Sequence, residues 1–274
     1  MQCRVRDLDV HCEVFGEGRP IVSVHGMGVN LRTMKGCMEP VLADHSDAWK
    51  RVYFDLPGMG RTKGADWIRN SDDMAQFVLD VIDEVVGEEP FAIVGESYGG
   101  YLARAVVRRR PTQVLGVLLI CPLVIAADDQ RDTAPLAVLH RDRRIEGVDA
   151  EETDFANLFL TNQTPETWQR FRDEMLVGFT CGDNEFESRI RADGAYAFAA
   201  DVDAAVSFER PALILAGRQD CLVGYRDAWK LLGNYPRASF AVLDMAGHAL
   251  QIEQPELFRA LVGEWLHRVA RFAA

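Results

Sequence analysis

Six short, nearly unbroken apolar runs recur along this chain, with longer amphipathic segments between them. The runs are "PIVSVHG", "RVYFDLPG", "FAIVGES", "VLGVLLICP", "PALILAG" and "ASFAVLDMAG". Strands have this composition when both of their faces are buried, as in parallel sheets covered by helices on each side. The alternation of such strands with helical patterns predicts a doubly wound α/β sheet, and it restricts the fold more than any other feature of the sequence.

The segments between the runs have the spacing of helices. "SDDMAQFVLDVIDEVV" repeats apolar residues at i, i+3 and i+4, with Ser71 as the expected N-cap and Gly87 as the stop. "YGGYLARAVVRRRP" ends in three arginines, which suit the negative end of a helix dipole. "EQPELFRALVGEWLHRVAR" closes the chain as a third helix. At the N-terminus, "CRVRDLD" and "VHCEVFG" alternate as an antiparallel hairpin does, so we expect eight strands, mostly parallel.

One stretch breaks the alternation. From about residue 123 to residue 207 we find helical patterns but no convincing buried strand. Within it, "TPETWQRFRDEMLVGF" begins with Thr164 and Pro165, a typical N-cap and N1 pair. A helical insertion between two strands would lie over one edge of the sheet as a lid. We therefore expect an α/β core of residues 1–122 and 208–274, and a helical cap of residues 123–207.

Charge and composition exclude several classes of partner. The chain has 274 residues and a formal net charge of −12, whereas nucleic acids and anionic membranes require a basic protein surface. The N-terminal "MQCRVRDLDV" lacks the apolar core of a secretory signal. The longest apolar run is interrupted by Pro122 and is shorter than the roughly 20 residues that cross a bilayer. We expect no nucleic acid and no membrane among the partners.

The six cysteines and six histidines are scattered, without CxxC pairs or the spacing of metal ligands. A chain of this length buries about three quarters of its unfolded surface, so it needs neither disulfides nor a metal to hold its core. We expect free thiols, a cytoplasmic location, no metal and no cofactor. A homodimer is compatible with the sequence, which leaves the oligomeric state open.

Residues that can carry chemistry follow three of the apolar runs. Ligands of open α/β sheets bind at the carboxyl ends of the strands, and these ends supply Ser97, Asp220 and His248 in "GESYGG", "GRQD" and "DMAGH". A serine hydroxyl is a weak nucleophile until an adjacent base takes its proton. His248 would be this base, and Asp220 would fix the tautomer of its ring.

The glycines around Ser97 indicate a sharp turn from strand to helix. Such a turn exposes the serine at a helix N-terminus, and side chains at Gly95 or Gly99 would collide there with neighbouring backbone. The developing oxyanion then needs two backbone N–H donors. We expect them from Tyr98, directly after the nucleophile, and from Met27 in "HGMG"; loss of one such donor typically costs about 100-fold or more in rate.

Other acidic residues compete with Asp220 for the acid position. Asp128 and Asp129 follow the sixth strand, and some proteins of the family that this chain resembles, named below, have the acid at that place. Asp55 ends the fourth strand in "DLPG", where an aspartate commonly hydrogen-bonds the backbone of a turn. The "GRQD" context favours Asp220.

Three further residues have a simpler interpretation than catalysis. His25 is expected to hold the oxyanion loop by hydrogen bonds. Glu96 is expected to support the turn, although its closeness to Ser97 would let it tune His248. Cys221 has no base of its own in the sequence and is interpreted as a packing thiol.

Taken together, "HGMG", "DLPGMGRT", "GESYGG", "GRQD" and "AGHALQIEQPELF" resemble the α/β-hydrolase fold superfamily, in the same order and at the same strand ends, across nearly the whole chain. The resemblance implies a Ser–His–Asp hydrolase with an oxyanion hole. It also implies a helical cap between the sixth and seventh strands, which the insertion at 123–207 fits.

The leading hypothesis is a serine hydrolase that cleaves a small carboxylic ester or related acyl compound with an apolar part, through an acyl-enzyme on Ser97. Hydrolysis of carbon–carbon bonds in ring-cleavage diketones is an alternative, but such enzymes usually have Trp after the catalytic histidine, where this chain has Ala249. Proline iminopeptidases usually have HGGPG where this chain has "HGMG". A ligand sensor without turnover would show the same three residues.

Overall fold

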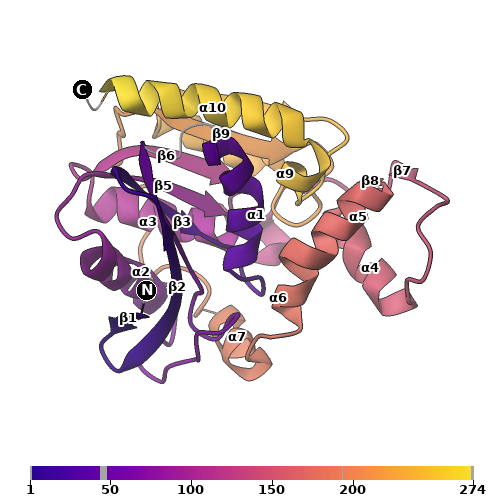
Figure 1. Cartoon of the computed structure of the whole chain (residues 1–274), viewed down its shortest axis with the longest axis horizontal. Coiled ribbons are helices and arrows are strands. Elements are labelled where there is room, and N and C mark those ends of the chain that lie inside the picture. Colours follow the sequence, from indigo (N-terminus) through magenta and orange to yellow (C-terminus); the bar gives the residue numbers. More distant parts are fainter. Residues whose placement is uncertain (1, 44–47, 193, 273–274) are drawn as a thin grey trace.

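An eight-stranded sheet forms the centre of the computed structural model, which describes residues 2–43, 48–192 and 194–272 (Figure 1). The strand order is β1-β2-β4-β3-β5-β6-β9-β10. β2 runs antiparallel to β1 and β4, and all other neighbours are parallel. The predicted mostly parallel α/β sheet is confirmed. Its strands are β1 (Gln2–Val5), β2 (Leu8–Phe15), β3 (Arg19–Val24), β4 (Trp49–Phe54), β5 (Phe91–Glu96), β6 (Val114–Ile120), β9 (Ala212–Gly217) and β10 (Ala238–Leu243).

Helices cover both faces of this sheet. α1 and α10 pack against each other over one face, and α2 and α3 cover the other (Figure 1). The central strands β5, β6 and β9 are buried along their whole length, as strands between two helical layers must be. The helices of the core are α1 (Leu31–Leu42), α2 (Ser71–Val85), α3 (Tyr98–Arg109), α8 (Tyr225–Lys230), η4 (Leu231–Gly233), α9 (Leu250–Glu253) and α10 (Pro255–Phe272).

Three details differ from the expectations. The hairpin turns at Arg6, whose φ is 54°, so the turn lies inside "CRVRDLD". Asn70, and not Ser71, caps α2 by accepting a hydrogen bond from the Asp73 N–H. The Ser71 hydroxyl instead bonds the Tyr98 hydroxyl and the Tyr196 carbonyl. The sequence analysis also passed over α1, which has Pro40 inside it.

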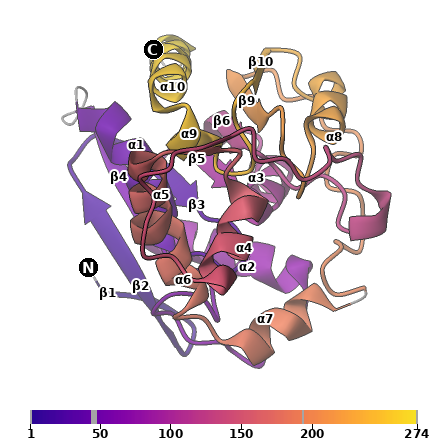
Figure 2. The ribbon, with the colours of Figure 1, turned by 90° about the vertical axis from the view of Figure 1, so that its right-hand side faces the viewer.

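The residues between β6 and β9 form short helices joined by loops, together with a separate two-stranded sheet of β7 and β8. We use the name cap segment for residues 123–207. Figure 1 draws α4, α5, α6 and α7 beyond one end of the sheet, and Figure 2 shows them in front of the strands. Thr164 caps α5 with Pro165 at its first position, as predicted. The elements are η2 (Asp128–Gln130), β7 (His140–Arg141), α4 (Ala150–Phe159), β8 (Asn162–Gln163), α5 (Pro165–Phe171), the π-helical turn η3 (Arg172–Leu176), α6 (Val177–Phe179) and α7 (Asn184–Arg191).

A buried arginine joins both ends of the cap segment to α3. Arg104 is 1% exposed, and its guanidinium donates to the Leu123 carbonyl at 2.5 Å and to both carboxylate oxygens of Asp203 at 3.1 and 2.5 Å. Leu123 and Asp203 lie where the chain leaves and re-enters the core. The base of the cap segment is therefore fixed to the helix that follows β5.

Two general properties follow from the described residues. None of the helices in the ranges 2–43, 48–192 and 194–272 is long and apolar enough to span a bilayer. All six cysteines are free thiols, and four of them are buried.

The contact between α3 and β3 leaves no room for a side chain. A Cβ on Gly99 would lie 2.1 Å from the Val24 carbonyl oxygen and 2.6 Å from that of His25. A Cβ on Gly95 would lie 2.3 Å from the Gly99 carbonyl oxygen. These glycines let the first turn of α3 approach the ends of β3 and β5.

The same substitution is expected to have opposite effects at two helical glycines. Gly263, in α10, has no heavy atom within 4 Å of an added Cβ. Gly263→Ala should raise the free energy of unfolding by about 0.5–1 kcal/mol, because alanine favours helix over glycine. Gly99→Ala should lower it by about 2–3 kcal/mol, because backbone must move to accept the methyl group. Urea unfolding of both variants measures this difference, and equal effects would contradict the tight contact.

Candidate active site

The structure brings the three predicted residues together at the carboxyl ends of β5, β9 and β10. Ser97 Oγ lies 2.9 Å from His248 Nε2, and His248 Nδ1 lies 2.8 Å from Asp220 Oδ2. Because Asp220 accepts at Nδ1, the neutral ring carries its proton there and presents a free lone pair to the Ser97 hydroxyl. His248 and Asp220 are buried, whereas Ser97 is half-buried.

Ser97 has an unusual backbone conformation that its neighbours hold in place. Its φ is 52° and its ψ is −117°, values that cost a residue with a side chain about 1–3 kcal/mol. The Ser97 N–H donates to the Ile120 carbonyl at 2.9 Å, and the Ser97 carbonyl accepts from the Leu123 N–H at 2.9 Å. The end of β6 thus secures the turn between β5 and α3 from both sides.

The electrostatics of the pair favour a charged Asp220 and a basic His248. Burial alone would raise the pKa of Asp220, but the His248 ring and the amides of Leu222 and Val223 lower it below its ordinary value. Burial alone would lower the pKa of His248, yet the charge and hydrogen bond of Asp220, followed by the charge of Glu96, raise it overall. The imidazolium form of His248 is therefore stabilised.

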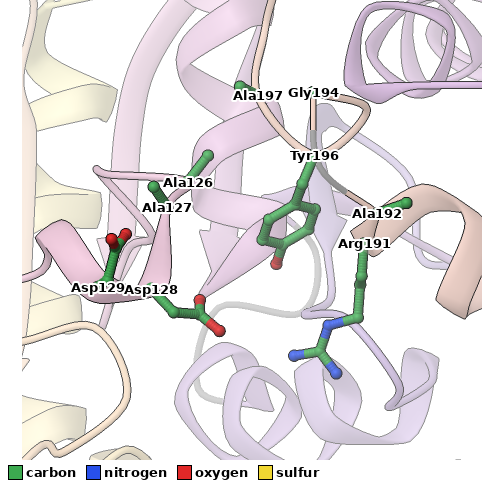
Figure 3. Close-up of a pocket in the computed structure, with 9 residues that line it drawn as sticks. All are labelled: Ala126, Ala127, Asp128, Asp129, Arg191, Ala192, Gly194, Tyr196 and Ala197. Carbon is green, nitrogen blue, oxygen red and sulfur yellow. The ribbon is translucent and has the colours of Figure 1, made fainter.

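The competing aspartates lie elsewhere. Asp128 and Asp129 line a pocket of about 410 Å³ whose opposite wall carries Arg191, with Tyr196 between them (Figure 3). Asp128 also pairs with Arg131 at 2.5 Å. Of the candidate aspartates, Asp220 is the one that accepts the hydrogen bond from His248 Nδ1.

Asp55 bonds the backbone of its own turn and of α1, as expected. It accepts from the amides of Leu31 and Arg61, each at 2.8 Å, and from His11 Nδ1 at 2.7 Å. Asp55 therefore holds the loop after β4 to the start of α1.

The loop at residues 25–28 lies against Ser97. A Cβ on Gly26 would be 3.1 Å from the Ser97 Cβ. His25 holds this loop: its Nδ1 donates to the Gly26 carbonyl at 2.7 Å, and its Nε2 accepts from the Leu56 N–H at 2.9 Å. Burial lowers the pKa of His25, which keeps the ring neutral in this role.

The two expected oxyanion donors have no competing acceptor. Tyr98 opens α3, so its N–H lacks an intrahelical partner. Among the residues that the structure describes, neither this amide nor that of Met27 donates to a side chain or a loop carbonyl. Both donors belong to segments that contact Ser97, at the turn and in the loop of Gly26.

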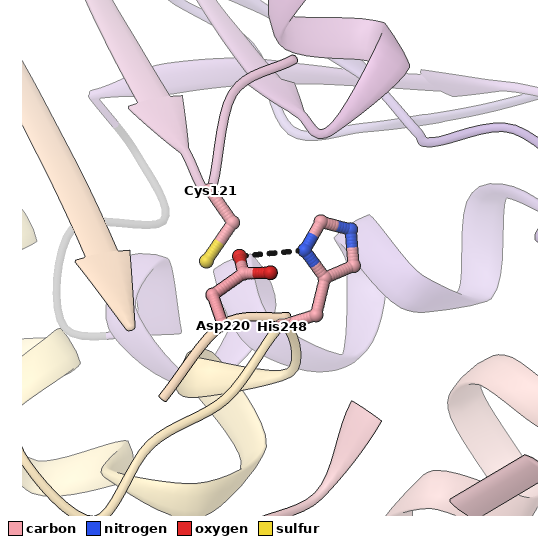
Figure 4. A group of neighbouring side chains, drawn as sticks. All are labelled: Cys121, Asp220 and His248. Carbon is pink, nitrogen blue, oxygen red and sulfur yellow. Dashed lines mark hydrogen bonds and ion pairs between the residues drawn. The ribbon is translucent and has the colours of Figure 1, made fainter. Parts of the chain in front are cut away.

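A thiol that the sequence analysis did not place near the site packs behind it. Cys121 Sγ, a carboxylate oxygen of Asp220 and a ring nitrogen of His248 all lie within 4.8 Å of one another (Figure 4). Burial, and next the charge of Asp220, raise the pKa of Cys121, so it stays a neutral thiol. Asp220 and His248 are hydrogen-bonded to each other, and Cys121 packs against them. This pair and its packing explain why the three side chains lie together, without a metal ion.

Three aromatic rings of the cap segment lie beside the site. Phe155, Phe159 and Phe179 contact one another with ring centroids 4.4–5.6 Å apart. The Phe159 ring lies 5.7 Å from the His248 ring, and a Cβ on Gly28 would lie 2.5 Å from the Phe179 ring. The three phenylalanines thus extend from the histidine to the loop of Met27. Helical spacing could not separate them from the other aromatics of this segment.

The sequence analysis missed Glu253. This buried carboxylate accepts from the Gly247 N–H at 2.6 Å, beside His248, and from the N–H groups of Thr161 and Asn162 at 2.7 and 2.8 Å. Burial raises its pKa to about 7, although all three amides lower it. Glu253 joins the cap segment to the loop that carries the histidine. Its contacts with Thr161 and Asn162 span more than 90 positions of sequence, so no local pattern indicates them.

Comparison with known proteins agrees with this fold. A sequence model of the alpha/beta hydrolase family matches residues 21–261. The chain is 26% identical over 274 residues to 2-hydroxy-6-oxononadienedioate/2-hydroxy-6-oxononatrienedioate hydrolase 2 of Pseudomonas putida, covering 95% of this chain and 92% of that protein. It is 22% identical over 275 residues to the pimeloyl-[acyl-carrier protein] methyl ester esterase of Legionella pneumophila (strain Corby), covering 94% and 100%.

Among solved structures, the alpha/beta superfamily hydrolase from Oenococcus oeni PSU-1 superposes with a TM-score of 0.90. It is 26% identical in sequence, and the alignment covers 98% of both chains. The fold, the match of the family model and these relatives lead to one conclusion: the chain belongs to the alpha/beta hydrolase family.

Proposed function

We propose that this alpha/beta hydrolase is a serine hydrolase that cleaves a small carboxylic ester or related acyl compound. One observation carries the proposal, namely the continuous hydrogen-bonded chain from Ser97 through His248 to the buried Asp220. A serine so placed can lose its proton to the histidine as it attacks a carbonyl carbon.

In the proposed reaction, Ser97 Oγ bonds to the carbonyl carbon while His248 Nε2 accepts the hydroxyl proton. The amides of Met27 and Tyr98 donate to the oxyanion. His248 then returns the proton to the leaving alcohol, and an acyl-enzyme on Ser97 remains. Water, deprotonated by the same nitrogen, hydrolyses this ester and frees the serine.

The phenylalanines above the site support a substrate with an apolar part. Phe155, Phe159 and Phe179 form an apolar cluster that contacts the His248 ring through Phe159. The pimeloyl-[acyl-carrier protein] methyl ester esterase relative is named for an ester substrate. The Pseudomonas putida relative is named for a dienedioate or trienedioate substrate, so carbon–carbon bond hydrolysis is the second candidate.

We propose further that residues 123–207 act as the lid of this site and that the protein works in a reducing compartment such as the cytoplasm. The contacts of Phe159 with the His248 ring and of Phe179 with Gly28 support the first statement. Six free thiols support the second, because oxidising compartments favour disulfides.

Ser97→Ala is expected to reduce turnover by a factor on the order of 10⁴ or more, since no other group can form the acyl-enzyme. The measurement is hydrolysis of p-nitrophenyl acetate, followed by a panel of activated esters, lactones, aryl amides and diketones. Labelling of the wild type with a fluorophosphonate, and not of the variant, tests the nucleophile directly. Equal turnover by both proteins would refute the assignment, and labelling without sustained turnover would support a sensor.

Asp220→Asn is expected to lower kcat by about 10⁴-fold, because the histidine loses the carboxylate that fixes its tautomer. Asp220 raises the pKa of His248 above its ordinary value of 6.5. The activity of the wild type should therefore be lost as pH falls through a pKa above 6.5, and this acid limb should move to lower pH in the variant. Asp128→Asn is the matched control and should retain most of the activity. A larger loss of kcat in Asp128→Asn than in Asp220→Asn would indicate that Asp128 is the acid partner of His248.

A further inference from the structure

A second carboxyl group lies beside the Ser97–His248 pair. Glu96 is 1% exposed, and its Oε1 is 3.6 Å from His248 Nε2, the nitrogen that also faces Ser97 Oγ. Its other oxygen, Oε2, has no hydrogen-bond partner among the residues that the structure describes. That oxygen lies 2.4 Å from the position of an added Cβ on Gly26, under the loop of Met27. The carboxyl group thus lies between the expected base and the expected oxyanion donors.

We propose that Glu96 is a second acid–base group of this site, a positioning residue that supports turnover as a neutral carboxylic acid and shares one proton with His248. The inference rests on the proposed function. It adds a residue that hydrolysis by Ser97, His248 and Asp220 alone does not require.

The first argument concerns the base. An ionised Glu96 would be a second counter-ion to an imidazolium that Asp220 already stabilises from the opposite side of the ring. With one proton shared by the two groups, the pair is either neutral Glu96 with neutral His248, or a carboxylate with an imidazolium. Only the first form leaves the Nε2 lone pair free to accept the Ser97 proton.

The second argument concerns the oxyanion. Charge that develops beside the loop of Gly26 and Met27 would face a buried carboxylate, and burial strengthens the repulsion between like charges. A neutral carboxyl group removes this repulsion, and it also lowers the cost of burying Oε2 without a donor. In the reactive form the shared proton is on Glu96, and it stays there while the proton that Ser97 releases passes to His248 and then to the leaving group.

Apart from Glu253, the other titratable groups near Glu96 and His248 keep a fixed protonation state, so these two residues are the ones that exchange this proton. Cys37 on α1 and Cys121 after β6 are buried thiols, and burial raises the pKa of each far enough to keep it neutral. Asp220 is ionised, with its pKa held low against burial by His248. Burial raises the pKa of Glu96 to about 7, against the lowering effects of His248 and the Gly26 amide.

Glu253 also titrates near pH 7 and bonds the Gly247 amide, beside His248. Among the described residues, its hydrogen bonds go to the amides of Thr161, Asn162 and Gly247, and none goes to the Ser97 hydroxyl or the loop of Gly26. Glu253 is left in place in every variant of the test, so its contribution is common to all of the profiles.

The kinetic test compares pH profiles of kcat/KM for p-nitrophenyl acetate between wild type and Glu96→Gln, per active site titrated with a fluorophosphonate. Ser97→Ala supplies the blank for spontaneous hydrolysis. The wild type should fall by about tenfold or more between its optimum and pH 9, as Glu96 ionises. Glu96→Gln should keep its maximum up to pH 9. Glu96→Asp retains a carboxyl group and should recover an alkaline limb.

Glu39→Gln is the matched control. Its carboxylate bonds Arg51 and Tyr53, away from Ser97, so this variant should keep the wild-type profile. An unchanged profile in Glu96→Gln would overturn the proposal. Loss of activity by the same factor at every pH would also overturn it, because that result describes a purely structural role.

A second measurement does not depend on turnover. In a Ser97→Ala background, the NMR titration of the His248 ring should be broad while Glu96 is present. It should become a single step at a pH lower by roughly one unit after Glu96→Gln, as expected when an opposite charge within 4–6 Å is removed. An unshifted titration would overturn the proposal. If wild type neither reacts with fluorophosphonate nor turns over, the proposed function fails, and this titration still decides whether the two groups share a proton.

Discussion

The backbone of Ser97 is the constraint on which the rest of this site depends. A left-handed φ at a residue with a side chain is unfavourable by itself, and two hydrogen bonds to the end of β6 and two glycines in contact with β3 maintain it. The hydroxyl then points to where the loops after β9 and β10 deliver Asp220 and His248. Since these loops come from neighbouring parallel strands, the register of the sheet sets the distances between the three side chains.

Much of this arrangement could be predicted because its causes are local in the sequence. Apolar runs that end in glycine indicate buried strands with tight turns, and "GESYGG" combines a nucleophile with the room that its turn requires. The order of Ser97, Asp220 and His248 along the chain followed from reading what each strand ends on. The sheet and the three residues of the Ser97–His248–Asp220 hydrogen-bonded series could therefore be predicted from the sequence.

Other parts depend on contacts that local patterns do not encode. Asn70 and Ser71 are equally good cap residues, and the tertiary hydrogen bonds of the Ser71 hydroxyl with the Tyr98 hydroxyl and the Tyr196 carbonyl decide between them. α1 contains Pro40, and a proline usually indicates the end of a helix. The proline removes one backbone hydrogen bond, and the packing of α1 on the sheet must offset this loss. Which cap aromatics face Ser97 depends on the path of a segment with short helices and a π-helical turn.

The carboxyl group of Glu253 joins the cap segment to the loop of His248 by hydrogen bonds. The amides of residues 161 and 162 supply two of its three hydrogen bonds, and the third comes from the amide next to the histidine. Because these amides lower the pKa of a carboxyl group that burial raises to about 7, displacement of residues 161 and 162 would favour its neutral acid form. The protonation of Glu253 and the position of this part of the cap segment are therefore thermodynamically linked.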